Sequence, residues 1–261
     1  HNNHFFLRIL AQQLRQILTY ARLKQCFSQE KDELVIGFER QNGDDFWIKC
    51  CFSPQFSTLQ FPSQFHRAGR NSIDLFSDLL LHEVQNVYVF ENERAIGLDF
   101  LGQQTLVLKL FGNRSNVILF QEGEHVAQFQ KKLGKDYELS LPALHRVINQ
   151  DFSAFEMADG DYKAIYPTIG KEGAAYFDAF GYATKSINGQ WEFLQETLEN
   201  LSEPLISIVE TSKGIGLTIF PIHGDALFQS HDAVDALNQF YSLHYSIGEF
   251  RREKGCLVEL L

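Results

Sequence analysis

The sequence lacks most of the features by which metalloproteins, secreted proteins and membrane proteins are recognised. It has four Cys, and no two of them stand in the Cys-x-x-Cys spacing of a zinc site. Cys50 and Cys51 are adjacent, and adjacent strand residues point to opposite faces of a sheet, so the pair cannot serve one site. No apolar run approaches the roughly 20 residues of a membrane span, and the first residues do not resemble a secretory signal. We therefore expect a cytoplasmic protein in a reducing compartment, without a membrane partner.

Catalytic and nucleotide-binding motifs are missing as well. The sequence contains neither a Gly-x-x-x-x-Gly-Lys-Ser/Thr phosphate loop nor a Gly-x-Ser-x-Gly nucleophile elbow. His82-Glu83 is not followed by the second His that a helical zinc site needs four residues after the first. The acidic pairs, such as Asp44-Asp45, lie in turn contexts where Asp side chains cap their own backbone. These absences predict a protein that is not an enzyme and uses no cofactor, metal or small-molecule substrate.

Positive charge is scarce, because 23 Lys and Arg stand against 33 Asp and Glu, a formal net charge of −10. Bulk attraction to nucleic acid depends on Lys and Arg, so any contact with RNA must be local. Candidate basic patches are residues 66–70, residues 130–135 with Lys131 and Lys132, and residues 251–254. Charge runs of this kind are commonly solvated surface, which is the alternative for each patch. The 24 Phe indicate an interior filled by aromatic rings.

The first half of the chain predicts an α+β lobe. Residues 3–20 place apolar side chains at helical spacing, whereas residues 34–38 and 46–48 alternate and flank a turn, which predicts a β-hairpin. Residues 73–81 favour a short helix. Short strands then follow at residues 84–91, 94–101, 105–111, 115–120 and 125–129, divided by Gly102, Gly112 and Gly123. We expect an antiparallel β-sheet or sandwich lobe over residues 1–140.

The second half predicts a helical subdomain at residues 141–230. Helices are expected at residues 144–148, 174–180 and 191–201, and a hairpin at residues 206–220. The turn at 167–173 includes Gly170 and Lys171 and has the composition of a helix-hairpin-helix unit, whose turn amides can meet a phosphate. The alternative is that these glycines only cap helices. Residues 231–261 predict a helix leading to a coiled coil in a chain that continues past Leu261.

Two segments suggest local contacts with RNA. In Glu91-Asn92-Glu93-Arg94, an acid beside an Arg at a strand boundary can present a rigid guanidinium to a base or phosphate, although a surface ion pair explains it too. Residues 110–119 predict a hairpin whose tip carries Gly112, Asn113 and Arg114. Turn geometry alone accounts for Gly112 and Asn113.

The second of these segments, Leu-Phe-Gly-Asn-Arg-Ser-Asn-Val-Ile-Leu, resembles the Gly-x-x-Ser-Asn-Ile-Ile-Leu signature of the NFACT family. These are bacterial ribosome quality-control factors related to eukaryotic NEMF and long labelled fibronectin-binding protein A-like. The resemblance covers nearly the whole chain: the opening His-Asn-Asn-His-Phe-Phe-Leu helix, the entry to the first hairpin, Pro-Thr-Ile-Gly before a helix and Phe-Pro-Ile before the last helix all fall in the family's order.

The resemblance implies an N-terminal lobe like that of formamidopyrimidine-DNA glycosylase, then a helix-hairpin-helix unit and a coiled coil. It also implies binding to obstructed large ribosomal subunits and to tRNA, with alanyl-tRNA used by the ribosome to add an alanine-rich tail to the stalled chain. The RNA-binding residues it favours, together with the basic segments, are Glu93, Arg94, Asn113, Arg114, Lys131, Lys132, Gly170 and Lys171. The family's Asp-Arg pair maps onto Glu93-Arg94, so Glu replaces Asp and alanine tailing is in doubt.

Three other functions compete with RNA docking. A base-excision glycosylase needs an N-terminal proline nucleophile and a four-Cys zinc finger, and neither is present. The old family label favours an adhesin that binds fibronectin at the cell surface, against which the missing signal sequence counts. A protein-interaction scaffold that pairs through the terminal helix is the third alternative.

Overall fold

A computed structural model describes residues 2–54, 56–212, 214–222 and 224–258, with side chains described as far as residue 246. Its N-terminal half consists of two five-stranded antiparallel sheets, so the expected α+β lobe with antiparallel sheets is confirmed. The first sheet has the order β4-β3-β2-β1-β5 and contains β1 (Arg22–Glu30), β2 (Glu33–Glu39), β3 (Asp45–Phe52), β4 (Ser57–Gln60) and β5 (Ile73–Asp74). The second has the order β10-β9-β8-β7-β6 and contains β6 (Val84–Val89), β7 (Ala95–Phe100), β8 (Gln104–Lys109), β9 (Asn116–Gln121) and β10 (Glu124–Gln128).

Helix α1 (His4–Leu18) packs into the core that the two sheets share. It begins after Asn3, whose side chain accepts a hydrogen bond from the Phe5 amide and so satisfies one of the free donors of the first turn. Apolar side chains at helical spacing, including Phe6, Leu10 and Leu14, are fully buried. The helix predicted at residues 3–20 is therefore confirmed, and its first turn lies against the loop between β6 and β7 through His4.

The second sheet is an up-and-down meander, so alternate connections lie at the same end of it. The loop from β6 to β7, the connection from β8 to β9 through the 3₁₀ turn η2 (Gly112–Arg114), and the segment after β10 all lie at one end. Side chains on the outer face of this sheet, such as Phe90, Val107 and Phe120, are covered by Leu139, Leu141 and Leu144. This end of the sheet carries most of the residues predicted to bind RNA.

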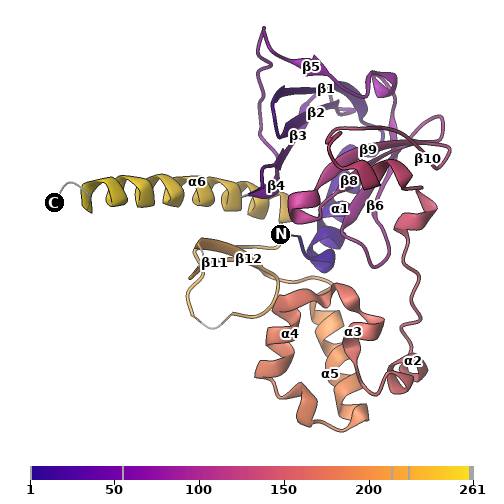
Figure 1. Cartoon of the computed structure of the whole chain (residues 1–261), viewed down its shortest axis with the longest axis vertical. Coiled ribbons are helices and arrows are strands. Elements are labelled where there is room, and N and C mark those ends of the chain that lie inside the picture. The colour runs from indigo at the N-terminus through magenta and orange to yellow at the C-terminus, as the bar shows by residue number, and fades with distance from the viewer. Residues whose placement is uncertain (1, 55, 213, 223, 259–261) are drawn as a thin grey trace.

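Four helices form a separate group below the sheets in Figure 1: α2 (Phe152–Met157), α3 (Tyr162–Ile165), α4 (Gly170–Ala179) and α5 (Ile187–Asn200). Asp151, Asp161 and Ser186 cap α2, α3 and α5 by accepting a hydrogen bond from a backbone amide of the first turn. A 3₁₀ turn, η5 (Pro167–Ile169), leads directly into α4, and Gly170 there has φ +75°, a left-handed conformation that favours glycine.

The chain then forms a three-stranded sheet in the order β12-β11-β13, with β11 (Ile206–Thr211), β12 (Gly214–Thr218) and β13 (Phe228–Ser230). Helix α6 (Ala233–Val258) buries Ala233, Ala236 and Phe240 against the body and then extends away from it (Figure 1). The side chain of Asn238 bonds both the amide and the carbonyl of Phe61, which fixes the helix to the end of β4. The basic patch expected at residues 251–254 and the coiled coil fall outside the described side chains.

Two predicted helices are wrong. Residues 73–81 form only β5 and a short 3₁₀ turn, η1 (Ser77–Leu79), because Phe76 and Leu81 adopt left-handed backbone conformations with φ of 50° and 67°. Residues 144–148 do not form a helix; a 3₁₀ turn, η4 (Pro142–Leu144), is followed by an extended segment. In that segment the backbone amide of Arg146 donates its hydrogen bond to the carbonyl of Glu91, in the loop between β6 and β7, and not to a preceding turn of a helix.

Candidate nucleic-acid interface

A basic surface forms at the end of the second sheet. It consists of residues 90–94, 109–116, 129–138 and 145–147, which we call the basic sheet end. Apart from the buried pair of Lys109 and Asp136, these segments carry six Lys or Arg and three Asp or Glu, whereas the whole chain carries 23 and 33. Because the meander places its alternate connections together, cations far apart in the sequence gather at one end of an otherwise acidic protein.

A groove of about 650 Å³ lies beside the basic sheet end. One wall comes from the loop between β6 and β7, with Glu93 and Arg94, and the other from the start of α4, with Gly170 and Lys171. The remaining lining includes Arg146, Thr168, Glu172 and residues of β12. Four of the eight residues predicted to bind RNA thus meet at one groove, although they come from opposite halves of the chain.

The other four predicted residues lie outside the groove lining. Asn113 and Arg114 are exposed in the turn between β8 and β9, at the same end of the sheet as Arg94. Lys131 and Lys132 are exposed after β10, and Lys132 is 3.6 Å from Asp32 in a surface ion pair. They extend the cationic surface along the sheet end and do not close a pocket.

The Glu93 carboxylate does not pair with the neighbouring Arg94 guanidinium, although the sequence suggests that it holds this guanidinium in place. The Glu93 carboxylate is instead 3.9 Å from the Arg146 guanidinium, a long ion pair between two loops. Within the described part of the chain, the Arg94 side chain forms no ion pair or hydrogen bond, and its guanidinium carbon lies 5.1 Å from the centroid of the Phe111 ring. An aromatic ring, and not an acid, is the nearest support of this arginine.

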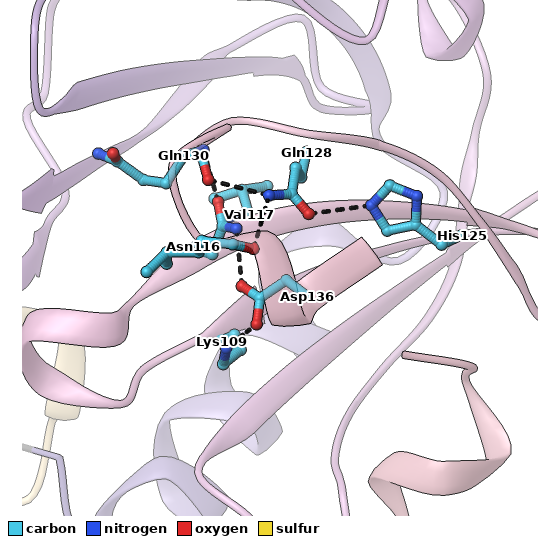
Figure 2. Close-up of polar contacts among 8 residues, drawn as sticks. Lys109, Asn116, Val117, His125, Gln128, Gln130 and Asp136 are labelled. Atoms are coloured by element: carbon cyan, nitrogen blue, oxygen red, sulfur yellow. Dashed lines mark hydrogen bonds and ion pairs between the residues drawn. The ribbon is translucent and has the colours of Figure 1, made fainter. Parts of the chain in front are cut away.

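A buried polar network holds the third segment of the basic sheet end in place (Figure 2). The Lys109 ammonium pairs with the Asp136 carboxylate, and both side chains are more than nine-tenths buried. Asn116 Nδ2 donates to the second oxygen of Asp136 at 2.8 Å, and Asn116 Oδ1 accepts from the Gln130 amide at 2.7 Å. Gln128 donates to the carbonyls of Gln130 and Leu133. The network therefore ties the loop with Lys131 and Lys132 to β8 and β9.

Sequence reasoning missed Arg146, Phe111 and the pair Lys109 and Asp136. Arg146 stood in a segment predicted as a helix. Lys109 had a detectable signal, because a lysine at the end of an apolar strand that is buried on both faces needs an acidic partner. Nothing local identifies Asp136 as that partner.

Two of the basic patches considered from the sequence differ in outcome. In the patch at 66–70, Arg67 bonds Ser72 and Asp74 and lies over the Phe27 ring, so it holds the loop against the first sheet. Residues 130–135 are part of the basic sheet end.

Across the described residues, no group of three or more His, Cys, Asp or Glu is arranged to hold a metal ion. Nor does any described helix combine the length and apolar character needed to cross a membrane.

His4 supports the loop that carries Arg94. Its Nδ1 lies 2.8 Å from the Glu93 carbonyl, which can only accept, so the neutral ring donates from Nδ1. Burial lowers the pKa of His4 below its usual value of 6.5, and the nearby Arg8 lowers it further, against the opposing effect of the hydrogen bond to Glu93.

We expect His4→Gln to reduce the pH dependence of stability. Because the folded pKa is below the unfolded one, the unfolded state takes up more protons as pH falls below 6.5, and the contribution of His4 is complete only above that pH. Urea unfolding of the wild type should therefore give a free energy that falls more steeply between about pH 7 and pH 5 than in His4→Gln. His66→Gln, in an exposed loop, is the control, and identical pH profiles for His4→Gln and the wild type would refute this role.

Comparison with known proteins supports the fold and gives a family. The family model described as NFACT N-terminal and middle domains matches residues 3–139. No curated protein matches the chain. Among solved structures, the fibrinogen-binding protein from Staphylococcus aureus is 15% identical with a TM-score of 0.63, covering 92% of this chain and 98% of the other.

Two streptococcal structures are similar in the same way. The N-terminal part of the fibronectin/fibrinogen-binding protein from Streptococcus suis is 14% identical with a TM-score of 0.65, covering 92% of this chain and 98% of the other. The N-terminal domain of the fibronectin-binding protein PavA from Streptococcus pneumoniae is 16% identical with a TM-score of 0.52, covering 93% and 98%. At such identities these likenesses show the shared fold.

Proposed function

Because the chain belongs to the family of NFACT N-terminal and middle domains, we propose that it is the nucleic-acid-docking part of a ribosome-associated quality-control factor. In this role it is not an enzyme. It docks on the tRNA and rRNA of obstructed large ribosomal subunits in the cytoplasm and supports alanine tailing of the stalled chain, with alanyl-tRNA as the tRNA used. The peptide-bond chemistry belongs to the ribosome.

The observation that carries this proposal is the concentration of cations at the basic sheet end, beside a groove lined by Arg94 and Lys171. An RNA backbone is attracted to such a patch and repelled by the acidic remainder, so the charge distribution favours one orientation of docking. Phosphate contacts of this kind position a nucleic acid, whereas contacts with bases select it. Lys131 and Lys132 are suited to the first task, and Arg94, at the mouth of the groove, is suited to the second.

The start of α4 adds a second type of donor. Gly170 begins the helix with no side-chain cap on its first amides, and a helix N-terminus carries a partial positive charge. With Lys171 beside it and Arg94 on the facing wall, the groove can accept a phosphate between the two halves of the chain. Desolvation raises the pKa of the Glu172 carboxyl in the same groove, which eases the approach of an anion as pH falls.

Co-sedimentation with large ribosomal subunits tests the proposal. We expect the whole protein to sediment with obstructed subunits, and Arg94→Ala to weaken that binding by about 5- to 100-fold, because an arginine that contacts a base or phosphate contributes on this scale. Arg15→Ala is the matched control, since Arg15 is exposed on α1 outside the basic sheet end. Absence of the wild-type protein from the ribosomal fractions, or equal losses in the two variants, would contradict the proposal.

Binding to fibronectin is the second candidate, favoured by the names of the two streptococcal structures. The two functions separate in a binding assay with immobilised fibronectin and, in parallel, immobilised tRNA. RNA docking predicts retention on tRNA that is lost as salt rises. Retention on fibronectin alone, unaffected by Arg94→Ala, would favour the adhesin.

A further inference from the structure

Phe111 stands next to the proposed RNA-binding arginine and has no assigned role. The Arg94 guanidinium carbon lies 5.1 Å from the centroid of its ring, and the Lys109 ammonium lies 5.2 Å from the same centroid. Both Arg94 and Phe111 are half-buried, so the arginine is supported by the protein and still reaches solvent. Because the Arg94 side chain has no ion pair or hydrogen bond within the described ranges, its donors are available to a ligand.

The ring is held in position by the sheet. The Leu110 amide donates to the Arg94 carbonyl at 2.8 Å, and Ala95 pairs with Lys109 at the adjoining ends of β7 and β8. Lys109, which shares the ring with Arg94, is itself fixed by its buried pair with Asp136. Backbone pairing therefore places the residue that carries the ring beside the residue that carries the guanidinium.

The chemistry of a supported guanidinium suits an unpaired nucleobase. A guanidinium is planar, stacks on aromatic and heterocyclic rings through its face, and keeps hydrogen-bond donors along its edge. Unpaired bases in RNA expose a face for stacking and acceptors on their edges, whereas bases within a duplex are already stacked. The neighbouring groove has a volume of about 650 Å³, within the range of sites that hold small organic groups.

We propose that Phe111 positions Arg94 to stack on an unpaired nucleobase, so that this end of the sheet selects single-stranded or loop segments of RNA over duplex. The inference rests on the proposed function and deepens it, because it assigns the base-selecting contact to Arg94 and names the kind of RNA that this contact selects. Phe111 is a positioning residue, and the contact with the base is made by Arg94.

The test compares two RNAs with the whole protein: a stem with a single-stranded loop, and a blunt duplex of the same length. Binding is measured by fluorescence anisotropy for the wild type, Phe111→Leu and Phe111→Tyr. Phe111→Leu keeps an apolar side chain and removes the ring, and Phe111→Tyr keeps the ring. We expect Phe111→Leu to weaken binding of the loop RNA by about 5- to 150-fold, the range for loss of one stacked base, with duplex binding within about twofold of the wild type. Phe111→Tyr should retain the preference.

The outcomes separate the two proposals. An unchanged loop preference in Phe111→Leu, or an equal loss for loop and duplex in a variant that melts like the wild type, would overturn the role of Phe111. If the wild type binds neither RNA, the proposed function fails and the stacking fails with it. If Phe111→Leu melts at a lower temperature, Arg94→Lys supplies the answer, because it keeps the charge and removes the planar group: it should lose the loop preference, and its retention would contradict the inference.

Discussion

Replacing Asp136 with alanine is expected to lower the free energy of unfolding by about 3–5 kcal/mol, the cost of leaving a buried charge without its partner. The Lys109 side chain is 8% exposed and that of Asp136 is 5% exposed, so water cannot replace the lost carboxylate. Asn116 Nδ2 would lose its acceptor as well. Urea unfolding followed by circular dichroism measures the loss.

Two further variants show whether burial is the cause. The double variant Lys109→Met with Asp136→Leu removes both charges and should recover the part of the stability lost to the unpaired charge, because a buried ion pair replaced by apolar side chains is often neutral. The loss from the unpaired Asn116 Nδ2 donor should remain. Asp74→Ala breaks the exposed pair with Arg67 and should cost less than about 1 kcal/mol. If Asp136→Ala costs no more than Asp74→Ala, the network in Figure 2 does not hold the basic sheet end together.

The second large effect is a change in the salt dependence of RNA binding when exposed cations are removed from the basic sheet end. Replacing Arg114, Lys131 and Lys132 together with glutamine should make the dependence of RNA binding on salt shallower, by about two to three in the slope of log affinity against log salt. Each exposed cation that neutralises a phosphate releases about one counterion, and these three side chains are exposed at one end of the sheet. Affinity at low salt should fall by more than about tenfold.

A charge-matched control distinguishes a local patch from net charge. The triple variant of Arg15, Lys163 and Lys185 to glutamine removes the same charge from exposed positions elsewhere. Its salt slope should equal that of the wild type. Equal changes in the two triple variants would mean that RNA responds to the total charge of the protein and not to the basic sheet end.

Local patterns predicted the elements whose stabilising contacts are local. The meander at residues 84–129 could be predicted because its strands are apolar and separated by glycines, two of which, Gly102 and Gly123, have φ near +88°. The segments at 73–81 and 144–148 could not, because left-handed residues and hydrogen bonds to distant loops override helical spacing. The backbone amide of Arg146, for example, donates its hydrogen bond to the Glu91 carbonyl.

For the candidate site too, the sequence could predict some features and not others. Sequence reasoning could select Arg94, Arg114 and Lys171 as chemically suitable residues. Their meeting at one end of the molecule depends on the meander and on the packing of η5, which leads into α4, against α1, and no local signal contains either. The ion pair of Lys109 with Asp136 joins residues 27 positions apart. The support of Arg94 by Phe111 likewise depends on the pairing of β7 with β8.

Ultraviolet crosslinking of the whole protein to tRNA, followed by mass spectrometry of the attached peptides, tests the central claim most directly. If the basic sheet end and its groove bind RNA, crosslinks should fall in residues 91–94, 111–114, 131–135 and 170–171. Crosslinks confined to the exposed faces of α5 or the first sheet, with none in these four segments, would contradict the assignment of the interface.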